Sequence, residues 1–316
     1  MPPLDPTPFR QACALLAEHL QGRESVGERR VWIRPEVRDR LMSNGGVKEK
    51  VEKIPPPPPP SQPLPPPAEA LAVDASGIVI EPPAAPGAVV LPPLALTVLQ
   101  SRKRSELLAE VSALAKAAPE PRALGTLRDT FVFATGNPEA RLMLIGEAPG
   151  MEEERQGEPF VGKAGELLDR VLTAMGLKRR DVYISNIVKY RPKAGEGPQG
   201  SGNRKPTARE MEVCLPIVRR EISIIRPKVI VALGGTAIGG LIGDADARIT
   251  QLRGKFLRCQ GVPVMPTFHP SYLLRQDAAI ERREKRKHWE DMMHVMEALG
   301  MPICDKQRGF FLGSGV

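Results

Sequence analysis

The sequence predicts an α/β protein, a three-layer α/β/α sandwich with a central, mostly parallel sheet. Apolar runs rich in Val, Ile and Leu recur in the second half of the chain, and segments with helical apolar spacing alternate with them. The runs are mostly apolar and show no apolar/polar alternation, as expected of parallel strands that helices cover on both faces. The chain of 316 residues also has ample material for such a core.

The elements of this sandwich can be placed along the chain. Strands are expected at residues 141–146, 182–189, 229–234 and 262–269. Helices are expected at residues 101–118, 163–176, 207–225, 236–243 and 283–299. The regular alternation of the two kinds of segment is what favours a parallel sheet.

A proline-rich region precedes the sandwich. Residues 55–93 hold 15 of the 34 prolines, which favours an extended tether without helices or ladders. Residues 9–20 and 34–42 have the spacing of two short helices, which is too little for an independent core. The expected organisation is a small helical appendage that docks a protein partner (1–50), a disordered linker (51–97), a catalytic domain (98–300) and a C-terminal tail (301–316).

The overall charge favours a polyanionic partner. The chain carries 45 basic and 37 acidic residues, a net charge of +8, and nucleic acid is the usual partner of such a protein. The first residues lack a basic and then apolar leader, and the longest apolar run, 229–243, falls short of the ~20 residues of a membrane helix. We therefore expect a cytoplasmic monomer that binds no membrane.

The four cysteines favour neither a zinc site nor a disulfide framework. Cys13, Cys214, Cys259 and Cys304 are far apart in sequence and form no CxxC pair. We expect reduced and mostly buried thiols.

Polar and glycine-rich segments follow the four expected strands. They are GEAPG at 146–150, Asn186, the Gly234-Gly235-Thr236 turn, and His269 with Pro270 and Ser271. Ligands of parallel α/β sheets bind at the carboxyl ends of the strands, so these segments are expected to meet at one cleft.

The first of these turns is strongly acidic, with Glu147, Glu152, Glu153 and Glu154 within eight residues. A phosphate loop would avoid such carboxylates, and GK[ST] is absent. Carboxylates at a strand end suit the positioning of water or the stabilisation of a developing cation. Glu147 is the best candidate for this role, whereas Glu152, Glu153 and Glu154 individually fit helix capping or solvated positions better.

Three further residues are candidates for base recognition. Phe160 offers a ring for stacking on a base, although core packing explains it equally well. Asn186 offers a donor and an acceptor to a base edge, or a structural hydrogen bond. His269 offers a hydrogen-bond donor to a leaving-group oxygen.

Basic and apolar side chains around the cleft are candidates for holding DNA. Lys189, Arg191, Arg253, Lys255 and Arg275 are expected to contact phosphate. The Leu273-Leu274 pair after His269 is expected on a loop that faces water.

Four blocks, read together, resemble one known family. GEAPG-x-EEE-x-x-GEPFVGKAGELL, VYISNIVKYRP, VIVALGGTA and FHPSYLLR resemble, in order and spacing, the family 4 uracil-DNA glycosylases of bacteria and archaea. The resemblance covers roughly residues 125–300. It implies an enzyme of base excision repair that flips uracil out of DNA and hydrolyses its N-glycosidic bond.

The resemblance also implies a role for individual residues. Glu147 and Glu153 match the functional acids, and His269 matches the histidine that faces a uracil carbonyl. The uracil-binding matches are Gly146, Ala148, Phe160 and Asn186. The matches at the DNA are the wedge Leu273 and the backbone-pinching Gly234, Gly235, Thr236 and Ser271, beside the basic Arg253, Lys255 and Arg275.

The chain departs from the family in its cysteines. Members typically hold an iron–sulfur cluster with four of them, and Cys214 is the only match here, with Tyr190 in the place of another. One thiolate cannot hold such a cluster, so we expect no cofactor and no metal. Residues 249–260 also lack the histidine with which a related subgroup traps DNA covalently.

Two other functions remain compatible with the sequence. One is a catalytically silent nucleic-acid-binding module on the same fold. The other is a glycosylase with a different base preference, such as hypoxanthine.

Overall fold

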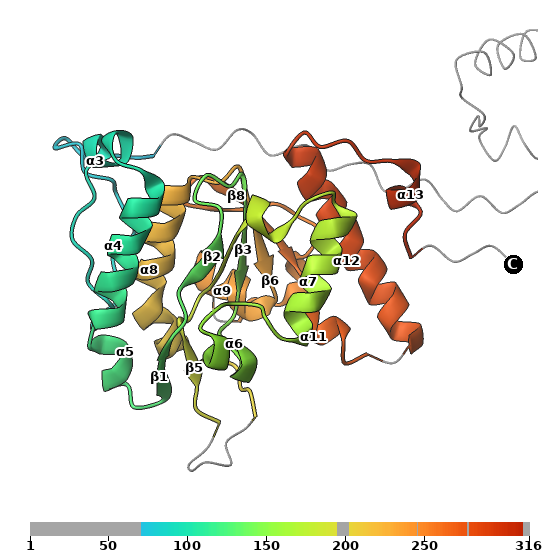
Figure 1. The fold of residues 1–316 in the computed structure, drawn as a ribbon, viewed down its shortest axis with the longest axis horizontal. Coiled ribbons are helices and arrows are strands. Elements are labelled where there is room, and N and C mark those ends of the chain that lie inside the picture. Colours follow the sequence, from blue (N-terminus) through green and yellow to red (C-terminus); the bar gives the residue numbers. More distant parts are fainter. Residues whose placement is uncertain (1–70, 195–201, 245, 277, 312–316) are drawn as a thin grey trace, which may run out of the picture. The chain divides into compact units, whose positions relative to one another are not determined.

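The computed structural model describes residues 71–194, 202–244, 246–276 and 278–311 (Figure 1). The expected N-terminal appendage and its two helices lie outside the described residues, as does the first part of the linker. Among the described helices, none combines the length and the apolar composition needed to cross a membrane.

The predicted α/β/α sandwich is confirmed. Within the described residues, the sheet has the spatial order β2 (Ala134–Gly136), β4 (Tyr183–Asn186), β3 (Leu142–Gly146), β6 (Val229–Leu233), β8 (Val262–Thr267) and β7 (Leu257–Cys259). The four inner strands run parallel, and both edge strands run antiparallel to their neighbours. The inner strands are those that the sequence predicts, one to four residues shorter.

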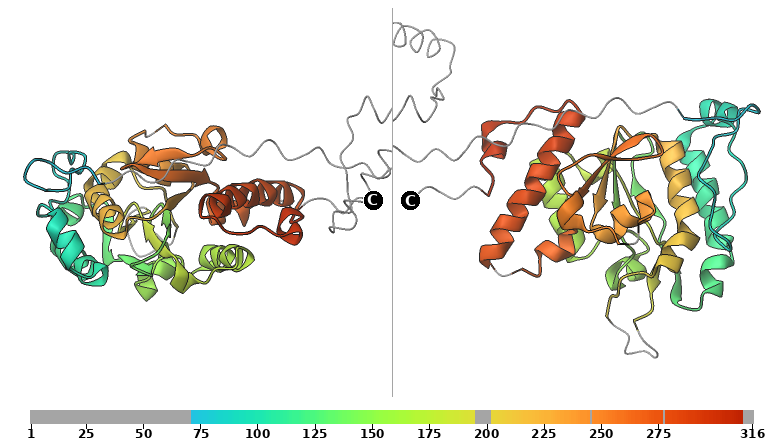
Figure 2. Two further views of the ribbon diagram at one scale, coloured as in Figure 1. Left: turned by 90° about the horizontal axis from the view of Figure 1, so that it is seen from above. Right: turned by 180° about the vertical axis from the view of Figure 1, so that it is seen from behind.

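Helices cover both faces of the sheet, as their apolar stripes require. One face carries α4 (Arg104–Ala117), α8 (Ala208–Ile225) and α9 (Gly235–Ile242), and the other carries α7 (Lys163–Ala174) and α12 (Ala278–Ala298). Both views in Figure 2 keep α8 and α12 on opposite sides of the sheet. Alternate residues of β3 divide between the two cores, with Met143 and Ile145 facing α8 and Leu142 and Leu144 facing α12.

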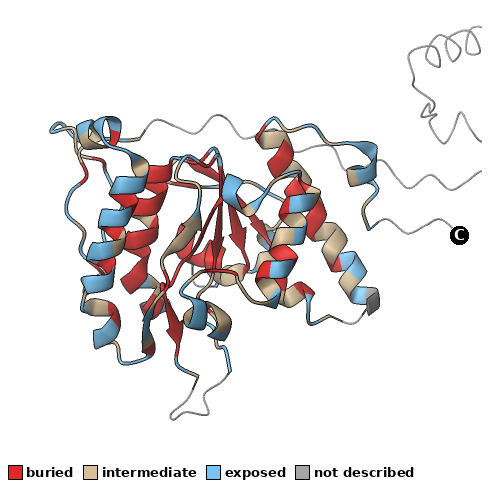
Figure 3. Ribbon diagram, viewed as in Figure 1, coloured by how far each residue is buried: buried red, intermediate tan, exposed pale blue. Residues whose placement is uncertain are grey.

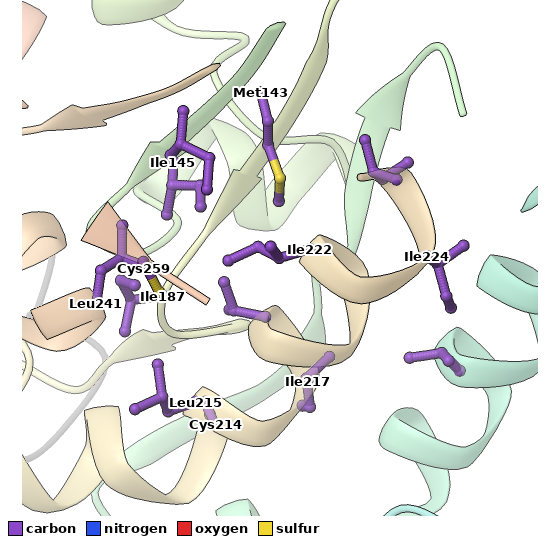
Figure 4. Packing of buried hydrophobic residues seen from close by; sticks show 14 of the residues in the cluster. Met143, Ile145, Ile187, Cys214, Leu215, Ile217, Ile222, Ile224, Leu241 and Cys259 are labelled. Atoms are coloured by element: carbon purple, nitrogen blue, oxygen red, sulfur yellow. The ribbon is translucent and has the colours of Figure 1, made fainter. Parts of the chain in front are cut away.

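Helix α8 lies deeper than a surface helix. It begins at a capping box, in which the Thr207 hydroxyl accepts from the Glu210 amide and Glu210 accepts from the Thr207 amide. It ends at Arg226, which has a left-handed φ of 47°. Most of its residues are buried, whereas the outer face of α4 is exposed (Figure 3). Figure 4 shows its apolar side chains against the sheet.

The expected disordered linker is wrong from residue 71 onward. The segment from Leu71 to Ala95 packs on α8, and its Val89 amide donates to the Val213 carbonyl at 3.0 Å. Glu81 accepts from the Arg220 guanidinium at 2.6 Å. Apolar residues between the prolines attach this segment to the core. Two of them, Val79 and Val89, are buried. Helix α3 (Leu96–Ser101) follows directly.

The described part of the C-terminal tail also packs on the domain. It forms α13 (Asp305–Arg308), and the ring of Phe310 lies 5.3 Å from that of Trp289 on α12. The Gln307 carbonyl accepts from the Trp289 indole at 2.6 Å. These contacts attach residues 305–310 to α12.

Short elements that the sequence did not predict complete the fold. A two-stranded sheet pairs β1 (Leu127–Phe131) with β5 (Tyr190–Pro192). The others are α5 (Glu120–Ala123), α6 (Met151–Gln156), a 3-10 turn η1 (Arg179–Asp181), α10 (Ile249–Leu252) and α11 (Pro270–Leu273), besides the edge strands of the main sheet. Most are too short for an apolar period to reveal.

A buried ion pair lies between the sheet and α8. The Lys189 ammonium donates to Glu221 at 2.6 Å and to the Ser185 hydroxyl at 2.6 Å, and Glu221 also accepts from the Tyr183 hydroxyl. Both charged side chains are fully buried. Burial lowers the pKa of Lys189 and raises that of Glu221, and their mutual attraction opposes both shifts.

We predict that Glu221→Leu destabilises the protein by about 3–5 kcal/mol, because it leaves the Lys189 ammonium buried without its counter-charge. The double variant Lys189→Met/Glu221→Leu should regain most of this loss, because it removes both charges. Urea unfolding of the variants measures both values. The exposed pair Arg209–Glu212 supplies the control, since Glu212→Ala should change stability by less than about 1 kcal/mol. A Glu221→Leu effect as small as the control would contradict the prediction.

Candidate active site

A cavity of about 660 Å³ opens at the carboxyl ends of the inner strands. Figure 1 shows α6 and α11 at this end of the sheet. The predicted site residues that line the cavity are Glu147, Ala148, Glu153, Phe160, Asn186, Gly234, Gly235, Thr236, His269, Ser271 and Arg275. The predicted convergence of the four strand ends is thus what the structure shows.

Gly146 ends β3 directly behind the cavity. A Cβ added there would overlap the Asn186 amide oxygen and the Phe160 ring. Phe160 itself has a left-handed φ of 58°, which is uncommon for a bulky residue, and its backbone lies against Gly165 of α7. The two glycines therefore provide the space that lets the ring and the amide meet beneath the cavity.

Asn186 ends β4 and is 2% exposed. Its Oδ1 atom has no hydrogen-bond partner among the described residues, although the side chain lines the cavity. A buried carbonyl oxygen without a partner costs about 1–3 kcal/mol. Such an atom is well placed to accept an N–H from a ligand.

His269 begins α11, and its tautomer follows from its contacts. Its Nδ1 accepts from the Ser271 amide at 3.1 Å, so a neutral imidazole carries its proton on Nε2. Burial lowers the pKa of His269 to about 4, and the charge of Arg275 adds to the shift. The imidazole is therefore neutral at physiological pH and offers one N–H donor. Its ring centroid lies 5.7 Å from that of Phe160.

Glu147 is the half-buried carboxylate of the acidic turn. Burial raises its pKa, and a hydrogen bond from Thr236 and the charges of Lys205 and Arg275 oppose the rise. Thr236 lies in the first turn of α9, whose leading N–H groups have no partner within the helix. The carboxylate therefore lies at the positive end of a helix.

Glu153 differs from the expectation of a catalytic acid. One of its oxygens accepts from the amides of Val161 and Gly162, both at 3.1 Å, and the other accepts from the Gly150 amide at 3.0 Å. The carboxylate thus ties the start of α6 to the loop that carries Phe160. These contacts suit a bracing role, and the catalytic role expected for Glu153 stays a prediction.

Leu273 and Leu274 lie in different environments, whereas the sequence predicts that both lie on a loop that faces water. Leu273 is 1% exposed and packs against Leu167 and Phe268 in a small core cluster. Leu274 is 39% exposed and lines the cavity. The helical turn of α11 directs the two side chains apart, so Leu274 lies at the cavity and Leu273 lies in the core.

Four of the predicted phosphate contacts are not at the cavity. Arg253 pairs with Asp291 at 2.6 Å, and Lys255 is exposed but does not line the cavity. Lys189 is buried with Glu221, and Arg191 is buried beside Glu154 at 2.9 Å. The fifth, Arg275, is exposed and lines the cavity as predicted.

Other cavity residues were missed by the sequence reasoning. The principal ones are Lys163 at the start of α7, Met151 on α6, and Asn203, Arg204 and Lys205 in the loop before α8. Lys205 lies close enough to Glu147 for its positive charge to lower the pKa of that carboxyl. The position of this loop in the chain, after β4, could have predicted it. The chain leaves β4 at the end of the sheet where the predicted segments lie.

The residues around Cys214 do not fit an iron–sulfur cluster. Cys214 is buried among apolar residues (Figure 4), and burial raises the pKa of its thiol to about 11. Tyr190 is fully buried in the same cluster, with its ring 5.4 Å from that of Phe131. Among the described residues, no group of three or more His, Cys, Asp or Glu side chains could hold a metal. A protonated thiol among aromatic rings is unsuited to bind iron.

Known proteins share the region that forms this cavity. The family described as the uracil DNA glycosylase superfamily matches residues 133–293. The type-4 uracil-DNA glycosylase of Thermotoga maritima is 43% identical over 157 residues, which are 49% of this chain and 78% of that protein. That of Archaeoglobus fulgidus is 37% identical over 181 residues, 55% and 84% of the two chains. That of Saccharolobus solfataricus is 38% identical over 202 residues, 61% and 86%.

The family match, residues 133–293, includes every inner strand of the sheet and the loops that surround the cavity. The resemblance of the four sequence blocks is therefore confirmed, and the chain belongs to the uracil-DNA glycosylase superfamily, with the type-4 enzymes as its relatives.

Proposed function

We propose that this chain excises uracil from DNA by hydrolysing the bond between N1 of uracil and C1′ of the deoxyribose. The observation that carries the proposal is the buried Asn186 amide oxygen, which has no partner among the described residues, on a residue that lines the cavity. Uracil presents an N–H between two carbonyl groups, and that N–H would satisfy this oxygen. The names of the type-4 relatives agree with the proposal.

The base side of the cavity suits a leaving uracil. The Phe160 ring provides a face for stacking, and Asn186 pairs with the polar edge. As the glycosidic bond breaks, its electrons move onto the base and negative charge develops on the carbonyl oxygens. The Nε2–H of neutral His269 donates to such an oxygen and stabilises the charge, so the base leaves as an anion.

The sugar side suits the attacking water. Positive charge develops at C1′ in the transition state, and the Glu147 carboxylate stabilises it. Glu147 also accepts a proton as the water oxygen bonds to C1′. The hydrogen bond from Thr236 and the nearby charges of Lys205 and Arg275 favour the ionised carboxylate that both roles need.

DNA approaches the cavity through basic and helix-terminal groups. Lys163, Lys205 and Arg275 line the cavity, and the first N–H groups of α9 lie at its edge. These groups suit phosphate oxygens independently of base sequence. Extrusion of the base costs a few kcal/mol of stacking energy, which an inserted Leu274 side chain would partly offset.

The first test is excision from a uracil-containing oligonucleotide, followed by alkali cleavage of the abasic product. We predict that Asn186→Ala and His269→Ala each lower the single-turnover rate by about 100-fold or more, because Asn186 orients the base for cleavage and His269 donates to the charge that develops on it. Affinity for abasic DNA should change by less than about threefold, because other residues hold the backbone.

His294→Ala is a matched control, because this histidine lies on α12 and does not line the cavity. Absence of abasic product with the wild type would contradict the proposal and favour a silent DNA-binding module. Faster release of hypoxanthine than of uracil would favour the other base preference.

A second prediction compares the adjacent leucines. Leu274→Ala should lower excision from double-stranded DNA about tenfold and leave excision from single strands within about twofold, because only the duplex must be unstacked. Leu273→Ala should instead destabilise the protein by about 2–5 kcal/mol, because it leaves a core cavity. Rate measurements on both substrates and urea unfolding separate the two effects. If Leu273→Ala alone lowered excision from the duplex and not from single strands, Leu273 would be the wedge after all.

A third prediction concerns the cofactor. We expect the purified protein to be active without an iron–sulfur cluster, with no absorbance near 400 nm and far less than one iron per chain. Cys214→Ala should keep the excision rate within about twofold, because the thiol packs in the core and does not line the cavity. Iron analysis, a visible spectrum and the excision assay test these expectations. A brown protein that loses its colour in Cys214→Ala would refute them.

A further inference from the structure

A buried polar network lies behind the catalytic histidine, on the side of the sheet that α12 covers. We propose that Thr267, His288 and Asp291 form a positioning unit that fixes the imidazole of His269 and so governs the chemical step without touching DNA. The inference rests on the proposed glycosylase function.

The hydrogen bonds of the unit define its protonation pattern. The Thr267 hydroxyl donates to Asp291 Oδ2 at 2.7 Å and lies 2.9 Å from Nδ1 of His288. Because the Thr267 hydroxyl donates its proton to Asp291, the hydroxyl oxygen accepts a hydrogen bond from the Nδ1–H of His288. His288 therefore carries its proton on Nδ1, and its buried Nε2 has no partner among the described residues.

The unit holds the chain immediately before His269. Thr267 ends β8, and Phe268 separates it from His269. Arg253 donates to both oxygens of Asp291, at 2.6 and 3.1 Å, and its guanidinium lies 5.5 Å from the centroid of the Phe268 ring. The side chains of Thr267 and Phe268 are thus both attached, directly or through Arg253, to Asp291 on α12.

The same strand end fixes the facing loop. The Thr267 carbonyl accepts from the Gly234 amide at 2.8 Å. A Cβ at Gly234 would lie 3.2 Å from the Cβ of His269, so the two loops are in close contact. A displacement of Thr267 would therefore move both the imidazole and the start of α9, where Thr236 faces Glu147.

Charge and burial favour a positioning role over simple packing. Thr267 and Asp291 are fully buried and His288 is 3% exposed, and apolar side chains would fill this space at lower cost in desolvation. Burial lowers the pKa of His288 to about 4, and the charge of Arg253 adds to the shift. The sequence pattern of α12 does not predict this buried network, because the segment is strongly basic.

A double-mutant cycle tests the inference. Thr267→Val keeps the shape of the side chain and removes its hydroxyl. We expect it to lower the single-turnover excision rate at least tenfold in the wild type, with KM and affinity for abasic DNA within twofold, because small misplacements of a catalytic group are costly. In the His269→Ala background it should lower the remaining rate by less than twofold, because the group it positions is gone. Equal losses in both backgrounds would overturn the inference.

Two matched variants separate positioning from stability. Thr267→Ser keeps the hydroxyl and should stay within threefold of the wild-type rate. Val264→Ala truncates a buried side chain of the same strand on the α8 face, so it should lower the melting temperature without lowering the rate. A rate loss in Val264→Ala equal to that in Thr267→Val would show that general loosening of β8 is the cause and would overturn the inference.

A measurement without DNA keeps this test independent of the proposed activity. The ring nitrogen and ring proton resonances of His269, recorded by NMR in the DNA-free protein, should shift or broaden in Thr267→Val and stay unchanged in Val264→Ala. Unchanged His269 signals in Thr267→Val would overturn the positioning unit. A wild type that releases no uracil, with His269 signals that respond as expected, would instead overturn the proposed function alone.

Discussion

The close approach at Gly146 is the constraint on which the site depends. Because this residue has no side chain, the Asn186 amide and the Phe160 ring can both occupy the space at the end of β3. Phe160 reaches this place through a left-handed backbone conformation, and the Glu153 carboxylate holds the loop that contains it. A strained conformation persists only where surrounding contacts fix it. The recognition surface is therefore built from backbone packing and bracing as much as from the side chains that would contact a base.

The same arrangement explains why a polar site can lie at the end of a very apolar sheet. The inner strands are buried on both faces, and the polar atoms begin where each strand ends. At two positions the polar network continues below the site, as Lys189 with Glu221 on the α8 face and as Thr267 with Asp291 on the α12 face. Each network is paired internally, so the buried charges are compensated before a ligand arrives.

Sequence patterns predicted the inner strands and the long helices because these elements span enough residues for an apolar period to appear. They also brought Glu147, Phe160, Asn186 and His269 to one cleft, since parallel strands share an edge. They could not predict side-chain partners. Arg253 and Arg275 look alike in sequence, yet Asp291 is packed against the first and the cavity lies beside the second. The proline count likewise concealed the valines that attach residues 71–95 to α8.

The acidic turn shows how a basic chain can carry four carboxylates at the proposed site for DNA. Glu152 pairs with Arg155 and Glu154 pairs with Arg191, so their charges are neutralised locally. Glu153 is occupied by three backbone amides. Glu147 lies at the cavity beside Thr236 at the start of α9, where the helix dipole and nearby cations stabilise its charge. Phosphate repulsion at the turn is thereby limited. The negative charge that remains is placed where hydrolysis of a glycosidic bond would create a positive one.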